Sequence, residues 1–405
     1  MTPFLKLVAD DLYQKLGGNF QNTCIIFPNK RASLFFNEYL WSNSEGKTMW
    51  TPEYTSISEL FAGLSEHTVG DSIYLVVKLW EVYKEKMKPT KTLDQLYSLM
   101  ETMLSDFQDI DNNMVEPAKL FLNIADLKEM TDFSFLEQEQ REAIEQFFGK
   151  FFEQKSKLSS PNTQLSPLKS QFKTLWNHLT EIYETYQKEL LTSEEEPMVY
   201  EGMLKRKVIE SLQDEEKQKR IDERLTAKTY VMVGFNVLNK TELELFRYLK
   251  QHRDTKFYWD YGISYLNKGG NTSSITTKYE AGQFIVENIR LLGNEFEGQD
   301  LFENMKQPKE ITFIQSPTEN AQTRYIDAWV KGHVKKDEPL RESAVILCNE
   351  NLLQPVLHSI GDVDAINVTM GYPLTETPIY SLVAALMELQ LRGRTASGAW
   401  RYKYV

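Results

Sequence analysis

A cluster of polar residues near the amino terminus has the types and spacing of an anion-binding site. It consists of Asn29, Lys30, Arg31 and Ser33. Lysine and arginine contact phosphate groups through their charge, and asparagine and serine add hydrogen bonds. Backbone N–H groups at the start of a helix also attract anions. The chemistry predicted for this cluster is therefore phosphate binding, and the alternative is an ordinary turn with solvated charges.

A buried strand and an amphipathic helix are predicted on the two sides of this cluster. Residues 24–27 are apolar and largely β-branched or aromatic, as in a parallel strand that is buried on both faces. Pro28 ends the strand, and Asn29 can cap the helix that follows. The apolar side of that helix is predicted to consist of Leu34, Phe35, Tyr39 and Leu40. The cluster would then stand at the carboxyl end of a strand, where open α/β sheets bind their ligands.

Length and charge limit the classes of protein to consider. A chain of 405 residues suggests two or three domains, and a hydrophobic content of 41% is enough for sizeable cores. With 46 Lys and Arg against 58 Asp and Glu, the net charge is −12. This charge disfavours attraction of the whole body to nucleic acid or to an anionic membrane, so any such contact must be local.

The two cysteines, Cys24 and Cys348, lie in separate apolar runs far apart in the sequence. This arrangement suggests neither a disulfide framework nor a cysteine-based metal site, and it is typical of a reducing compartment. The amino terminus has no basic segment followed by a long apolar stretch, and no run approaches the roughly 18 apolar residues of a membrane-spanning helix. We therefore expect a cytoplasmic protein without a membrane partner.

The hydrophobic period changes along the chain and predicts four segments. Residues 1–66 form the first part of an α/β core, and residues 67–226 form a helical insertion. Residues 227–307 complete that core. Residues 308–405 are expected to begin a second α/β core that is truncated.

Strands and one capped helix are predicted at specific places in the last two segments. The first core is expected to gain strands over residues 229–235 and 256–261. In the second core, strands are predicted over residues 311–315, 343–348 and 365–370. A helix over residues 379–391, capped by Thr377 before Pro378, follows them.

Nucleotide hydrolysis has no support in the motifs. No Gly-x-x-x-x-Gly-Lys-Ser/Thr sequence is present, and the nearest approach, Gly46-Lys47-Thr48, follows no strand. Residues 105–109 resemble the acidic, magnesium-holding motif of helicase ATPases. The apolar residues before them keep helical spacing, so Asp106 and Asp109 are interpreted as solvated helix residues.

Other catalytic chemistries lack their residues as well. None of the five histidines lies near a second histidine or a cysteine at ligand spacing, so no zinc site is predicted. A Gly-x-Ser-x-Gly elbow is absent, and no carboxylate pair with a partner lysine stands at a strand end, as a metal-dependent nuclease needs. We predict no catalytic residue, no metal and no cofactor.

Four segments together resemble the amino-terminal half of the AddB-like proteins, the inactivated superfamily 1 helicase subunits of bacterial helicase–nuclease complexes that process double-strand DNA breaks. The segments are Ile-Ile-Phe-Pro-Asn-Lys-Arg-Ala at residues 25–32, residues 233–235 with Glu242 and Leu243, residues 313–329 and residues 344–391. The first is similar to helicase motif Ia, whose role in that family is to touch single-stranded DNA. The last is similar to the start of the second helicase core domain.

The resemblance implies an α/β fold of helicase-like (RecA-like) parallel-sheet cores with a large all-helical insertion. The chain departs from an active helicase, because the nucleotide loop before Cys24 is missing and Cys348 and Asn349 stand where active relatives have a phosphate-sensing arginine. ATP hydrolysis is therefore not expected. Many AddB-like proteins continue into a carboxy-terminal PD-(D/E)XK nuclease domain, to which nothing in this chain is similar, so nuclease activity is expected only of a full-length relative.

The leading hypothesis is a non-catalytic, helicase-like scaffold that binds or guides DNA in double-strand-break repair and recombination. Its partners would be single-stranded or broken-end DNA and a helicase–nuclease subunit. The predicted nucleic-acid contacts are Asn29, Lys30, Arg31 and Ser33. Two alternatives stay open: a protein interaction module without DNA affinity of its own, which the net charge favours, and an ATPase with a degenerate nucleotide loop at Lys47.

Overall fold

The structure is a computed structural model, and the chain divides in it into two compact units, Met1–Gln307 and Pro308–Val405. The described residues are 2–121, 165–192, 197–262, 267–268, 275–277, 279–296, 307–333, 343–361, 366–395 and 397–404. Residues 122–164, within the predicted helical insertion, lie outside them.

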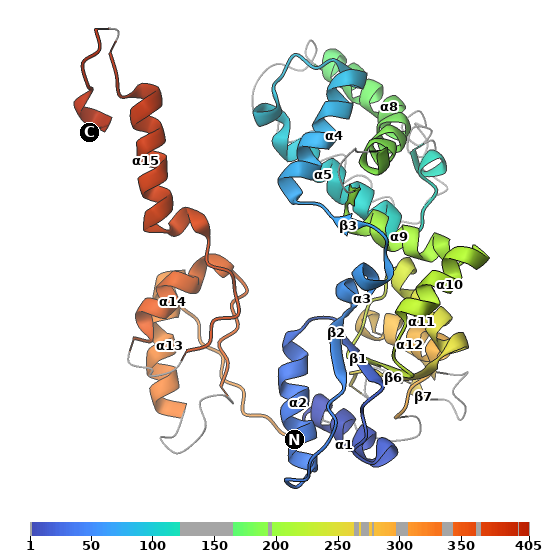
Figure 1. The fold of residues 1–405 in the computed structure, drawn as a ribbon. Coiled ribbons are helices and arrows are strands. Elements are labelled where there is room, and N and C mark those ends of the chain that lie inside the picture. Colours follow the sequence, from blue (N-terminus) through green and yellow to red (C-terminus); the bar gives the residue numbers. More distant parts are fainter. Residues whose placement is uncertain are drawn as a thin grey trace. The chain divides into compact units, whose positions relative to one another are not determined.

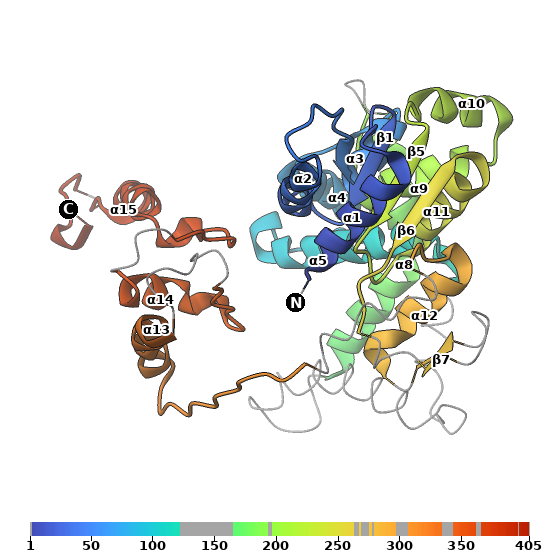
Figure 2. The same cartoon turned by 90° about the horizontal axis from the view of Figure 1, so that it is seen from below.

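The first unit is built on a four-stranded parallel sheet in the order β2-β1-β5-β6. Its strands are β1 (Thr23–Phe27), β2 (Glu53–Ser56), β5 (Thr229–Val233) and β6 (Asp254–Tyr258). Figure 2 shows β1, β5 and β6 side by side. Every residue of the two middle strands, β1 and β5, is buried, which explains their continuous apolar sequences. The predicted α/β class is confirmed. The strands predicted near β1, β5 and β6 are confirmed as well, but β5 ends at Val233 and β6 spans Asp254–Tyr258, where residues 229–235 and 256–261 were predicted.

Helices cover both faces of the sheet. Alternate residues of a strand point to opposite faces, so Ile25 joins one core cluster and Ile26 the other. The helices on the first face are α1 (Phe4–Leu16) and α2 (Arg31–Asn43), and those on the second are α3 (Ile57–Leu64) and α11 (Lys240–His252). A further helix, α12 (Glu280–Leu292), follows β6 in the chain and packs in the second cluster.

The inward side of α2 differs from the predicted one. Phe36 and Leu40 are buried. Leu34 and Phe35 are instead exposed, by 71% and 50%. The ring of Phe36 packs against that of Phe27 on β1, with the centroids 5.7 Å apart. Because this contact turns Phe36 toward the sheet, the prediction that Leu34 and Phe35 belong to the apolar side is wrong, whereas Leu40 is confirmed there.

Between α3 and β5 the chain forms a helical part of the first unit. Its described helices are α4 (Ser72–Met87), α5 (Leu93–Asn112), α8 (Leu165–Thr192), α9 (Glu201–Ser211) and α10 (Glu215–Arg224). Figure 1 shows α4, α5 and α8 gathered away from the sheet, with α9 nearer to it. Two short strands, β3 (Thr68–Val69) and β4 (Met198–Val199), pair in parallel here. The resemblance implied an all-helical insertion, and the pairing of β3 with β4 shows that this expectation is wrong.

The second unit contains the helices α13 (Glu319–His333), α14 (Leu353–Ser359) and α15 (Pro378–Arg392). The helix predicted over residues 379–391 is confirmed by α15, and the hydroxyl of Thr377 accepts a hydrogen bond from the N–H of Tyr380 as its cap. None of the helices in the described ranges of the chain has both the length and the apolar character that crossing a membrane requires.

The three strands predicted for the second unit are not formed. The described residues of segments 311–315, 343–348 and 365–370 belong to no strand. Most of their apolar side chains are exposed, Phe313 by 94% and Ile346 by 87%. A strand forms only when a neighbour completes its ladder of hydrogen bonds, and the local sequence does not supply that neighbour. The prediction of these strands is therefore wrong.

Candidate functional site

The four predicted site residues lie at the carboxyl end of β1, in the connection to α2 and in its first helical turn. We call this segment, Asn29 to Ser33, the turn after β1. Arg31 is the first residue of α2, and Asn29 and Lys30 precede it. The side-chain oxygen of Asn29 accepts a hydrogen bond from the N–H of Ala32 at 3.4 Å, as expected of a residue that caps a helix. The hydroxyl of Ser33 donates to the carbonyl of Lys30 at 2.6 Å. Local hydrogen bonds therefore hold this turn in shape.

The two basic residues of the turn differ in their partners. The Lys30 Nζ forms an ion pair with Oε1 of Glu59, and these two side chains are 73% and 42% exposed. No hydrogen bond or ion pair joins the exposed Arg31 guanidinium to any residue that the structure describes. A guanidinium presents several N–H donors that match a phosphate. Arg31 can thus take an anion without giving up a partner, whereas Lys30 cannot.

Glu59 reaches the turn because β2 pairs in parallel with β1. Phe27 lies opposite Ser56 in the register, and Lys30 and Glu59 each follow three residues later. The N–H of Ser56 donates to Oε2 of Glu59 at 3.1 Å, in the capping box that begins α3. The hydrogen bond from Lys30, followed by that from Ser56, holds the pKa of Glu59 below its usual value. Glu59 is therefore an ionised carboxylate at the same edge of the sheet.

A pocket of about 180 Å³ opens at this edge. The residues lining it are Lys30, Ser33, Tyr54, Thr55 and Glu59. The Tyr54 hydroxyl donates to the side-chain oxygen of Asn37 at 3.1 Å, and burial raises the pKa of Tyr54, so this phenol stays neutral. The lining combines one cation, one carboxylate and three hydroxyl groups. Such a set binds anions weakly, because the carboxylate opposes the cation.

The other residues that the sequence brought up for catalysis do not line this pocket. The part of the chain that the structure describes holds no group of three or more His, Cys, Asp or Glu that could bind a metal ion. Asp106 and Asp109 are exposed residues of α5, as predicted. Lys47 follows the carboxyl end of α2, where the helix dipole disfavours phosphate. Burial raises the pKa of Cys24 to about 12, so its thiol stays protonated.

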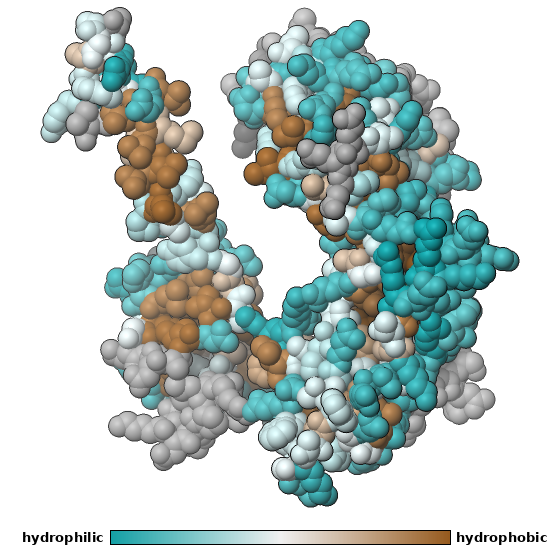
Figure 3. All heavy atoms as spheres, viewed as in Figure 1, coloured by the Kyte–Doolittle hydropathy of each residue, from teal (hydrophilic) through white to brown (hydrophobic). Residues whose placement is uncertain are grey.

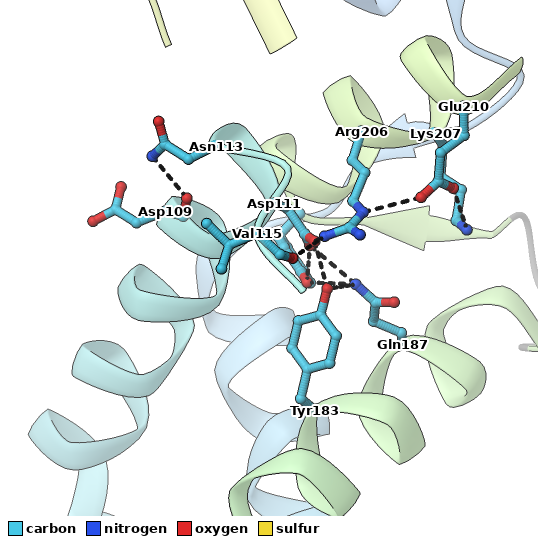
Figure 4. Close-up of polar contacts among 10 residues, drawn as sticks. Asp109, Asp111, Asn113, Val115, Tyr183, Gln187, Arg206, Lys207 and Glu210 are labelled. Atoms are coloured by element: carbon cyan, nitrogen blue, oxygen red, sulfur yellow. Dashed lines mark hydrogen bonds and ion pairs between the residues drawn. The ribbon is translucent and has the colours of Figure 1, made fainter. Parts of the chain in front are cut away.

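A buried carboxylate lies in the helical part. Asp111, at the end of α5, is fully buried and forms an ion pair with Arg206 at 3.1 Å. It also accepts hydrogen bonds from the hydroxyls of Tyr183 and Tyr200 and from the amide of Gln187. Figure 4 shows the side chains of Tyr183, Gln187 and Arg206 converging on Asp111. The protein itself satisfies this carboxylate, so we interpret the cluster as structural.

A second buried charge joins the helical part to the layer around the sheet. Lys205 of α9, whose side chain is 7% exposed, pairs with Glu201 at 3.0 Å and with Glu242 at 3.3 Å. Glu242 belongs to the capping box of α11. Glu201 accepts a hydrogen bond from the Ser58 hydroxyl of α3 at 2.6 Å. These contacts fix the position of α3, the helix that carries Glu59.

Sequence reasoning missed Glu59 as a part of the site. The available signal was its spacing from Ser56, because a serine followed three residues later by glutamate marks a helix start. The helices α2 and α3 follow adjacent parallel strands, so their first residues come together at one edge of the sheet.

No model of a known protein family matches the chain, and a search of curated proteins also gave no match.

Proposed function

We propose that the chain is a non-catalytic, helicase-like scaffold that binds single-stranded DNA and guides it within a double-strand-break repair helicase–nuclease. The observation that carries the proposal is the exposed Arg31 guanidinium, without a partner among the described residues, in one turn with Asn29, Lys30 and Ser33. This turn follows the central strand β1, at the edge where open parallel sheets bind ligands. Phosphate contacts from such a turn position nucleic acid without reading its sequence.

A RecA-like core in the first unit is part of the proposal. Its support is the parallel sheet covered by helices on both faces, together with the resemblance of residues 25–32 to helicase motif Ia. The chain leaves the sheet after α3 and returns with β5 directly beside β1. An insertion into a single core gives this pattern. The partner in this proposal is a helicase–nuclease subunit that supplies ATP hydrolysis and cleavage.

Arg31→Glu is expected to weaken the binding of an oligothymidine strand about tenfold at low salt, because one phosphate contact is replaced by a repelling carboxylate. The slope of log K against log salt concentration should also become shallower by about 0.7, the value for one phosphate of a single strand. Fluorescence anisotropy titrations at several salt concentrations measure both quantities.

Lys47→Glu is the matched control, because it makes the same kind of charge reversal at an exposed residue outside the turn. We expect its affinity to stay within about twofold of the wild type. Equal losses in the two variants, or no loss in Arg31→Glu, would remove Arg31 from the interface. The same control tests the ATPase alternative, which would be supported by DNA-stimulated phosphate release that Lys47→Glu abolishes.

A protein interaction module is the second candidate, and the surface of α15 favours it. None of the residues of α15 is buried. Its large exposed apolar residues are Ile379, Tyr380, Leu382, Val383, Leu386, Met387 and Leu391. Figure 3 shows this helix as a largely hydrophobic surface. Contiguous exposed apolar surface of this kind marks sites of protein association.

Leu386→Asp is expected to weaken association with a co-purifying helicase subunit at least about tenfold, because a charge would be buried in an apolar contact. An interaction module without DNA affinity of its own should bind no oligothymidine before or after this change. Ser381→Asp, at an exposed polar position on the opposite side of the same helix, is the control and should keep the wild-type association. Titration of the purified subunit measures the effect, and an undiminished affinity of Leu386→Asp would exclude α15 from the interface.

A further inference from the structure

The turn after β1 already holds an anion, the carboxylate of Glu59. One of its oxygens pairs with the Lys30 Nζ. The other accepts hydrogen bonds from the N–H of Ser56 at 3.1 Å and from its hydroxyl at 3.0 Å. A phosphate bound at this turn would use the same Lys30 Nζ. Glu59 therefore stands where an anionic ligand of Lys30 would stand.

We propose that Glu59 is an intramolecular competitor of the DNA phosphate for Lys30, and that it sets the affinity and the salt dependence of the site. The inference deepens the proposed function and rests on it. In the DNA-free protein, Lys30 is neutralised by Glu59, and Arg31 alone in the turn offers a cation without a partner among the described residues.

Glu59 is the fixed member of the ion pair. The capping box ties its carboxylate to the backbone of Ser56 at the start of α3. The residue before Glu59 in the helix, Ser58, donates to Glu201 of α9 at 2.6 Å, and this contact holds α3 against the helical part. The carboxylate therefore cannot move away without breaking the helix cap.

Lys30 is the mobile member, since its side chain is 73% exposed and its stem has four carbons. An exposed ion pair is worth about fivefold at most in the equilibrium between the paired and the separated side chains. A phosphate can therefore displace the Glu59 carboxylate from Lys30. After displacement, the fixed charge of Glu59 remains near the phosphate and repels it. A single small anion gains little from this exchange. A polyanion that engages Arg31 at the same time gains two contacts, so the pair selects nucleic acid over free phosphate.

The test is Glu59→Gln, because glutamine keeps an oxygen that accepts the Ser56 hydrogen bond and so preserves the cap while removing the charge. We expect oligothymidine to bind about two- to fivefold more tightly at low salt. The slope of log K against log salt should steepen by about 0.7, because no carboxylate is then left behind to take up a salt cation when Lys30 contacts a phosphate. In a Lys30→Gln background, the same change should give less than about half of the gain.

Glu81→Gln is the matched control. It removes one charge from another exposed ion pair, between Lys78 and Glu81 of α4 at 2.9 Å. We expect it to leave both the affinity and the salt slope unchanged. If Glu59→Gln binds no more tightly than Glu81→Gln while Arg31→Glu weakens binding, the inference is overturned and the proposed function stands. If neither the wild type nor Glu59→Gln binds oligothymidine, both are overturned.

Discussion

Asp111→Ala is expected to lower the free energy of unfolding of the first unit by about 3 kcal/mol or more, since it breaks a buried ion pair by removing one partner. Arg206 loses the carboxylate that it contacts at 3.1 Å. The hydroxyls of Tyr183 and Tyr200 lose their acceptor. Burial, followed by the charge of Asp111, raises the pKa of both tyrosines, so both remain protonated donors. Each buried donor without an acceptor adds about 1–3 kcal/mol.

Urea unfolding followed by circular dichroism measures this effect. Asp109→Ala is the control, because Asp109 is an exposed residue of the same helix and points away from the cluster (Figure 4). We expect this control to stay within about 0.5 kcal/mol of the wild type. Asp111→Asn should fall between the two, because it keeps an acceptor and loses the charge opposite Arg206. Equal stability of Asp111→Ala and Asp109→Ala would show that the cluster does not stabilise the fold.

The burial of Asp111 could not be predicted from the helical pattern of the sequence. The spacing of apolar residues predicted the helix that is α5 and placed Asp106 and Asp109 in solvent, as observed. It gave no reason to bury Asp111, because the partners of that carboxylate come from α8, from α9 and from Tyr200 before α9, at least 72 residues further along the chain. A buried charge is recognisable only with its partners.

The central strands of the sheet were predictable for a physical reason. β1 and β5 are covered on both faces, so each must be apolar at consecutive positions, and such runs stand out in a sequence. The side of α2 that faces the sheet was not predictable in the same way. Phe35 stands four residues before Tyr39 and Phe36 four before Leu40, so either phenylalanine fits a helical period. The choice of Phe36 depends on its ring contacts with Phe27 and with Tyr54 of β2.

In the second unit, the sequence predicted strands that the structure does not form. Segments such as residues 311–315 and 343–348 have the composition of strands, and in the structure their described residues pair with nothing. The cost of leaving Phe313 and Ile346 in water does not create a strand, because a strand also needs a neighbour with matching hydrogen-bonding groups. Composition thus predicts the suitability of a segment for a sheet, and pairing decides whether the sheet forms.

The candidate site likewise has one part that local sequence predicts and one part that depends on strand pairing. Asn29 to Ser33 could be proposed from the sequence because they belong to a single turn, whose geometry follows from a strand, a proline and a helix start. The spacing of Glu59 from Ser56 marked a helix start, but its approach to Lys30 could not be proposed, since it depends on the register that sets Phe27 opposite Ser56. Local sequence therefore predicted the cations, and the parallel pairing of β1 with β2 supplied the anion that opposes them.

Gly202→Ala is expected to destabilise the first unit by about 2–3 kcal/mol through overpacking of two helices. A Cβ atom at Gly202 of α9 would lie 2.6 Å from the carbonyl oxygen of Gln108 on α5 and 2.9 Å from its Cα. Both are backbone atoms, so the helices would have to move apart. Gly63→Ala is the control, because nothing lies within 4 Å of its Cβ position on α3, and alanine there should stabilise the helix by up to about 1 kcal/mol. Since the two variants add the same methyl group, opposite shifts of the urea midpoint would locate the effect at the contact between α5 and α9, and equal shifts would contradict it.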